Sequence, residues 1–163
     1  MKKNKLRGII LLGIASILIF TNCYDDSEIK FDVKTFNREW KAWEDQGIVD
    51  YSVNQKWDTF EIGINTQVIV KDNAVNQMIS INHYGLIGEG RTISDIYIWI
   101  NSVYEKYRDK GGPINITITY NNEYHYPEYV VIIPQKTLAN GEGIRQTRII
   151  LSEFMPLMSL TEE

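Results

Sequence analysis

The segment Ile114-Asn115-Ile116-Thr117-Ile118-Thr119-Tyr120 decides the fold, because it alternates apolar and polar side chains more regularly than any other part of the chain. A period of two places the apolar side chains on one face of a β-strand and the polar ones on the other. Residues 129–133 should pair with this strand across a loop at 121–127. A strand that is buried on one face only is typical of an antiparallel sheet, since parallel sheets are covered on both faces.

Two helices are predicted by apolar side chains that recur every three or four residues. The first begins after Asp32, ends at Gly47, and carries the stripe Val33, Phe36, Trp40 and Trp43. The second begins at Thr92, whose hydroxyl can form a capping box with Asp95, and ends at Gly111. Its stripe consists of Ile96, Trp99, Ile100, Val103 and Tyr107. Tryptophans on such stripes indicate helices that face a core.

The remaining strands are predicted at 48–57, 64–71, 75–82 and 144–151, where β-branched and aromatic residues are frequent. Asp72-Asn73 should form a tight turn, because both residues tolerate a positive φ. We therefore expect an α+β fold, in which an antiparallel sheet has two helices packed on one face. The expected element order is α-β-β-β-α-β-β-β.

The amino terminus indicates export from the cell. Four basic residues in the first seven precede an apolar run at 8–20, which is too short to cross a membrane. Residues 1–22 therefore form a predicted signal peptide. Ile19-Phe20-Thr21-Asn22-Cys23 resembles a bacterial lipobox, which implies that the sulfur of Cys23 carries a diacylglycerol and that Cys23 begins the mature protein. Two alternatives are an ordinary secretory cleavage site and an uncut anchor.

Charge limits the partners of the mature chain. Removal of residues 1–22 changes the formal net charge from -4 to -8, because that segment contains four basic residues and no acidic ones. An acidic chain without a basic stripe is not suited to nucleic acid or to anionic headgroups. Membrane attachment is therefore expected through the lipid on Cys23, with residues 23–31 as a tether and 32–163 as a single domain. The expected location is the cell envelope, on the periplasmic or outer-surface face.

Residues that could carry catalysis are few. The chain has two histidines, His83 and His125, and no cysteine besides Cys23, so the sequence groups no metal ligands and predicts no cofactor. His83 with Glu89, or His125 with Glu123, could form an acid/base pair, which keeps a hydrolase as an alternative. Gly85, Gly88 and Gly90 lack the lysine and the spacing of a phosphate-binding loop, and they indicate a turn.

An aromatic cluster near one hairpin is the best candidate for a partner surface. Tyrosine is enriched where proteins meet partners, because its ring offers a stiff contact with a polar tip. Tyrosine also favours strands, so structural packing is the alternative interpretation. The candidate surface consists of Tyr120, Tyr124, His125, Tyr126 and Tyr129.

Several separated motifs together resemble uncharacterised bacterial envelope lipoproteins whose single domain has no known function. The resemblance covers nearly the whole mature chain and implies no activity. It departs from the family at 55–60, where members often have two cysteines, and at 138–142, where they often have an acidic stretch. The motifs are the helix with Trp40 and Trp43, Asp50-Tyr51-Ser52, the hairpin at 68–75, Thr92-Ile93-Ser94-Asp95-Ile96, 116–120, Tyr126-Pro127 and Phe154-Met155-Pro156-Leu157.

These features favour a lipid-anchored binding or scaffolding module that is not an enzyme. Its ligand would be another envelope protein, a glycan or a peptide. A hydrolase that uses an acidic residue with a histidine is one alternative, and an inhibitor of an exported enzyme is another, by analogy with small α+β domains.

Overall fold

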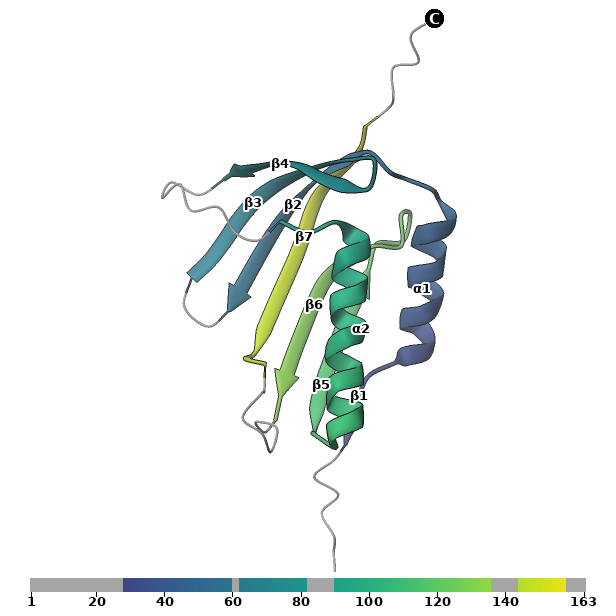
Figure 1. Ribbon diagram of the computed structural model, residues 1–163, viewed down its shortest axis with the longest axis vertical. Coiled ribbons are helices and arrows are strands. Elements are labelled where there is room, and N and C mark those ends of the chain that lie inside the picture. The colour runs from purple at the N-terminus through teal and green to yellow at the C-terminus, as the bar shows by residue number, and fades with distance from the viewer. Residues whose placement is uncertain (1–27, 60–61, 82–89, 136–143, 158–163) are drawn as a thin grey trace, which may run out of the picture.

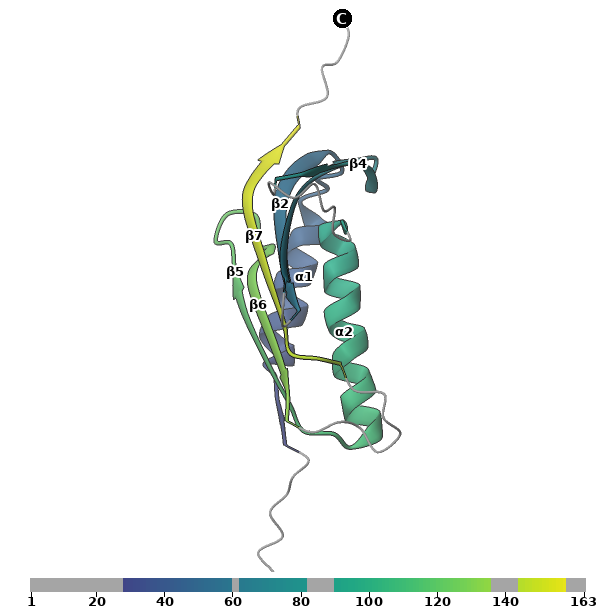
Figure 2. The ribbon, with the colours of Figure 1, turned by 90° about the vertical axis from the view of Figure 1, so that its left-hand side faces the viewer.

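The computed structural model describes residues 28–59, 62–81, 90–135 and 144–157, and within them seven strands form one sheet that two helices cover (Figure 1). Both helices lie on the same side of the sheet, as Figure 2 shows. The elements are β1 (Ile29–Lys30), α1 (Val33–Asp45), β2 (Tyr51–Thr59), β3 (Ile62–Lys71), β4 (Ala74–Ser80), α2 (Ile93–Lys110), β5 (Ile114–Tyr120), β6 (Pro127–Pro134) and β7 (Thr147–Pro156).

The sheet is mixed rather than purely antiparallel. Its strand order is β1-β5-β6-β7-β2-β3-β4, and every neighbouring pair is antiparallel except β1 with β5. The predicted α+β class is confirmed, whereas the predicted order lacks β1. Ile29 and Lys30, which the sequence assigned to the tether, pair in parallel with Ile114 and Asn115. Two residues are too few to produce a detectable period, so the sequence pattern could not predict this strand.

The helix ends follow the predicted capping chemistry. Asp32 caps α1 by accepting the backbone N–H of Thr35 at 3.0 Å. Thr92 and Asp95 form both bonds of a capping box at the start of α2. Gly111 ends α2 in the left-handed region at φ 65°, where glycine has no steric penalty.

The core contains aromatic side chains from both helices. Phe36 is fully buried, and its ring lies 5.1 Å from Phe31 and 5.5 Å from Tyr97. The predicted stripe of α2 omitted Tyr97, which is fully buried and stacks on Trp40 at 5.6 Å. Trp99 is instead half-buried beside Trp57. The buried face of α2 therefore includes Tyr97 and differs slightly from the face that Trp99 indicated.

Two local irregularities shape the ends of the sheet. Asp72 and Asn73 have φ values of 51° and 58°, so the predicted tight turn between β3 and β4 is confirmed. The register between β2 and β7 shifts between Ser52 and Asn54, opposite Glu153, whose φ is 52°. Such a bulge re-aims the side chains that follow it. The predicted last strand ended at residue 151, but β7 continues to Pro156, and the half-buried Phe154 packs against the core.

Candidate functional site

The loop between β5 and β6 is closed by hydrogen bonds from Asn121. Its side-chain Oδ1 accepts the N–H groups of Glu123 at 3.0 Å and Tyr124 at 2.7 Å. Its backbone N–H donates to the carbonyl of Tyr126, and its carbonyl accepts the N–H of His125. Within this turn, His125 has a φ of 59°, in the left-handed region that side chains larger than glycine adopt at a steric penalty.

The five residues of the predicted aromatic surface do not form one surface. Tyr126 is buried, and both its ring and that of Tyr124 pack on Phe154, at 5.0 Å and 4.9 Å. Tyr129 precedes the buried Val130 on β6, so its side chain lies on the sheet face that the helices leave uncovered. Of the five, Tyr120 and His125 line the groove between α1 and the β5–β6 hairpin. Structural packing therefore accounts for Tyr124 and Tyr126.

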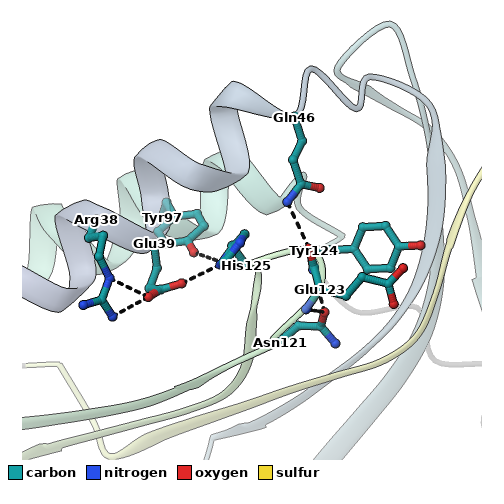
Figure 3. A network of polar contacts seen from close by, with 8 residues as sticks. All are labelled: Arg38, Glu39, Gln46, Tyr97, Asn121, Glu123, Tyr124 and His125. Atoms are coloured by element: carbon teal, nitrogen blue, oxygen red, sulfur yellow. Dashed lines mark hydrogen bonds and ion pairs between the residues drawn. The ribbon is translucent and has the colours of Figure 1, made fainter.

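His125 pairs with a helix residue and not with its neighbour Glu123. Its Nδ1 lies 2.8 Å from Oε2 of Glu39 on α1 (Figure 3). Arg38 donates to the other carboxylate oxygen of Glu39, from Nε at 2.9 Å and from Nη2 at 2.5 Å. The hydroxyl of Tyr97 donates to the carbonyl of His125 at 2.5 Å. The other predicted pair, His83 with Glu89, lies outside the described residues.

Gln46 adds a second link between α1 and the loop. Gln46 caps the end of α1, about two turns beyond Glu39. Its Nε2 donates to the carbonyl of Glu123 at 3.3 Å (Figure 3). The loop is thus held against α1 at two points and against α2 through Tyr97. Three elements that are distant in sequence therefore fix the position of the imidazole.

The ionisation of Glu39 reflects two opposed effects. Burial disfavours the charged carboxylate, since only 12% of its side chain is exposed. The hydrogen bonds from Arg38 and His125 outweigh burial, so the pKa of Glu39 is lowered from its ordinary value of 4.5. Burial raises the pKa of Tyr97 and of Tyr120, and it raises that of Tyr126 to about 12. Glu39 is therefore an anion at neutral pH, and these phenols are neutral.

A groove of about 390 Å³ lies between α1 and the β5–β6 hairpin. Thr35, Arg38 and Glu39 form its helix wall, and residues 118–122 with His125 form the opposite wall. Arg38 and Glu39 neutralise each other, so the groove offers many hydrogen-bonding groups and little net charge. Sequence reasoning missed Glu39, although it lies three residues after Phe36 and four before Trp43 on the buried side of the helix. A carboxylate in such a position indicates a partner inside the fold.

Neither a metal cluster nor a membrane span was found in the described part of the chain. No group of three or more His, Cys, Asp or Glu side chains is placed to hold a metal ion there. Among the described helices, none has the length and apolar character that crossing a bilayer requires.

Replacement of Glu39 by glutamine is expected to destabilise the domain by about 1–2 kcal/mol at pH 7, since a hydrogen-bonded charge is replaced by a neutral group. The lowered pKa of Glu39 means that its carboxylate stabilises the fold above pH 4.5 and loses this effect as the pH falls through its folded-state pKa. The difference between wild type and variant should therefore shrink below about pH 4. Urea denaturation at pH 7, 5 and 3 measures it.

Glu44→Gln provides the matched control, because Glu44 is exposed on the same helix. Its effect should stay within about 0.5 kcal/mol at each pH. An equal loss for Glu39→Gln at pH 7 and pH 3 would contradict the role given to the ionised carboxylate.

The fold and the groove define a small α+β domain that carries a polar groove at one end of a helix-covered sheet. The chain belongs to the family of unknown function DUF6174, whose model matches residues 35–150. This match confirms the resemblance to a single domain of unknown function and includes every residue that lines the groove. No curated protein has significant sequence similarity to the chain.

Proposed function

We propose that this protein is a lipid-anchored module of the bacterial cell envelope that binds a partner in the groove between α1 and the β5–β6 hairpin. The observation that carries the proposal is the position of His125. This residue has an unfavourable backbone conformation, yet Glu39 and Tyr97 hold it at the wall of the groove. Strained residues that their surroundings hold firmly are concentrated at functional sites.

The proposed anchor is the lipidated sulfur of Cys23. Ile29, where β1 begins, lies six positions after Cys23. Six residues span at most about 20 Å, so this tether would keep the domain close to the membrane surface. The proposed mature chain has a net charge of -8, so electrostatic attraction to anionic headgroups would not hold the domain at the membrane.

Binding is a better account of the groove than catalysis. Glu39 is the only carboxylate in the groove lining, and the lining offers the hydroxyls of Thr35 and Thr119 but neither serine nor cysteine. The carboxylate is also engaged by both Arg38 and His125. Among the hydrogen bonds of the described residues, His125 is joined to Glu39, Tyr97 and Asn121, and to neither threonine of the groove.

One observation favours a second candidate function. A carboxylate 2.8 Å from a histidine Nδ1 orients the ring as in enzymes that use histidine as a general base. If the protein is a hydrolase, His125→Gln should lower kcat/KM by at least about 100-fold on its substrate. A panel of chromogenic acyl, phosphoryl and glycosyl esters provides the screen, and activity that His125→Gln leaves unchanged would exclude this pair.

Site-specific photo-crosslinking in living cells tests the binding proposal. A benzoylphenylalanine in place of Asn122, an exposed residue of the groove, is expected to form a discrete cross-linked species. The control is the same substitution at Ile133, which is 38% exposed on β6 and outside the groove. Cross-links of equal yield at both positions, or at Ile133 alone, would contradict a partner in the groove. The cross-linked band at position 122 should disappear in Arg38→Ala if the groove is the site.

A further inference from the structure

One edge of the sheet is only partly covered. β5 is seven residues long, whereas β1 beside it is two residues long and ends opposite Asn115. After Lys30 the chain enters the helix layer through Phe31 and begins α1. Within the described ranges, no other strand lies beside β5 on that side. Residues 116–120 therefore form an open strand edge.

The hydrogen-bond pattern shows which backbone groups this edge presents. The N–H of Gln135 donates to the carbonyl of Pro113, and this pair continues the register that joins Ile114 to Pro134. In an antiparallel pair, bonded and non-bonded positions alternate, so Asn115, Thr117 and Thr119 bond to β6. Ile118 and Tyr120 consequently direct their N–H and C=O groups away from β6. Pro127 and Pro134, which have no N–H, lie opposite Tyr120 and Ile114, in agreement with this assignment.

The open edge and the groove are the same place. Ile118 and Tyr120 both line the groove, and α1 forms its other wall with Thr35, Arg38 and Glu39. A groove between a strand edge and a helix is the geometry in which several domains bind a peptide as an added strand. Main-chain bonds then supply affinity, and alternate side chains of the peptide enter the groove.

We propose that the partner of this groove is an extended peptide segment that adds to the free edge of β5, in line with β1. The proposal rests on the proposed binding function and specifies the class of ligand. β1 already shows that this edge accepts an extended segment. A strand of about five residues would cover the remaining edge at roughly 3.3 Å per residue. Its groove-facing side chains would be short and polar, to match Arg38, Glu39 and His125.

β4, at the opposite end of the sheet, is a weaker candidate for strand addition. The groove beside α1 contains no residue of β4, and residues 82–89, which follow β4 closely, lie outside the described residues. A saccharide in the groove would use the same polar side chains but not the outward backbone groups of Ile118 and Tyr120. The backbone groups therefore distinguish a peptide from the other ligands.

The test begins with the purified mature protein in detergent micelles and a phage-displayed library of random ten-residue peptides. A selected peptide is synthesised with an N-methyl group at each backbone nitrogen in turn. Strand addition predicts that alternate N-methyl groups weaken binding about tenfold or more, whereas the intervening ones change it less than about twofold. The peptide should also slow amide hydrogen exchange at Ile118 and Tyr120. Arg38→Ala should weaken binding, and Lys34→Ala, an exposed change on the same helix, should not.

Each other outcome has a definite meaning. Binding without an alternating N-methyl pattern, or protection at β4 in place of β5, would overturn strand addition at this edge. If no peptide is selected but a soluble peptidoglycan fragment shifts the NMR signals of the groove residues, the peptide proposal fails and the binding function survives. If neither probe perturbs residues 118–125, both proposals fail.

Discussion

Replacing Cys23 by serine is expected to move the protein from the membrane fraction to the soluble fraction almost completely. In the proposed lipoprotein the Cys23 thiol receives a diacylglycerol, and a serine hydroxyl cannot replace it, so the two acyl chains would be lost. Each buried methylene contributes about 0.8 kcal/mol to membrane binding, and two chains are enough for stable anchoring. Phase separation in Triton X-114, with intact-mass measurement of both forms, is the assay.

The folded domain should not respond to this change. Cys23 lies outside the described residues, and β1, which begins at Ile29, is the first described element that pairs with the sheet. The melting temperature of Cys23→Ser should therefore equal that of a wild-type domain released by proteolysis in the tether. A wild-type protein that enters the aqueous phase, or that retains Met1 or a free Cys23 thiol, would refute the anchor.

Phe36→Ala is expected to lower the free energy of unfolding by about 3–5 kcal/mol, which is a large part of the 5–15 kcal/mol typical of a domain. Phe36 is fully buried, and its ring contacts those of Phe31, Trp40 and Tyr97. Its loss would leave a cavity where α1 meets α2. The midpoint of urea denaturation, with the slope held as a check on two-state behaviour, measures the effect.

Ile98→Ala is the matched control, because Ile98 lies on α2 with 54% of its surface exposed. It should change the stability by no more than about 0.5 kcal/mol. The cavity left by Phe36→Ala should also loosen the packing of α1, which forms one wall of the groove. The affinity for the peptide should therefore fall together with the stability. A loss below about 1 kcal/mol would show that the aromatic cluster repacks without α1 moving.

The elements that sequence could predict are those in which local chemistry and burial agree. The alternation at 114–120 specifies a strand because each isoleucine faces the same side, and β5 has these bounds. Asp32 and Thr92 specify helix starts because their side chains satisfy N–H groups that the helix leaves without partners. Asp72-Asn73 specifies a turn because few other residues accept two successive positive φ values.

The candidate site was predicted only in part, because its contacts join residues that are far apart in the chain. His125 meets Glu39 across 86 positions, and no local pattern contains that distance. Tyr126 was included in the candidate partner surface because tyrosine is enriched where proteins meet partners, but its ring packs on Phe154, next to the bulge at Glu153. β1 was assigned to the tether because its stability comes from the strand beside it and not from its own two residues.

The parallel pairing of β1 with β5 also fixes the end of the sheet at which the chain from the proposed anchor enters the domain. The chain arrives beside Ile114, at the start of β5, and the hairpin loop follows Tyr120, at its end. Six steps along a strand correspond to about 20 Å. With Cys23 as the proposed anchor, the hairpin loop would therefore lie about 20 Å farther along the sheet than the end of β5 at which the chain enters, within reach of a partner that never touches lipid.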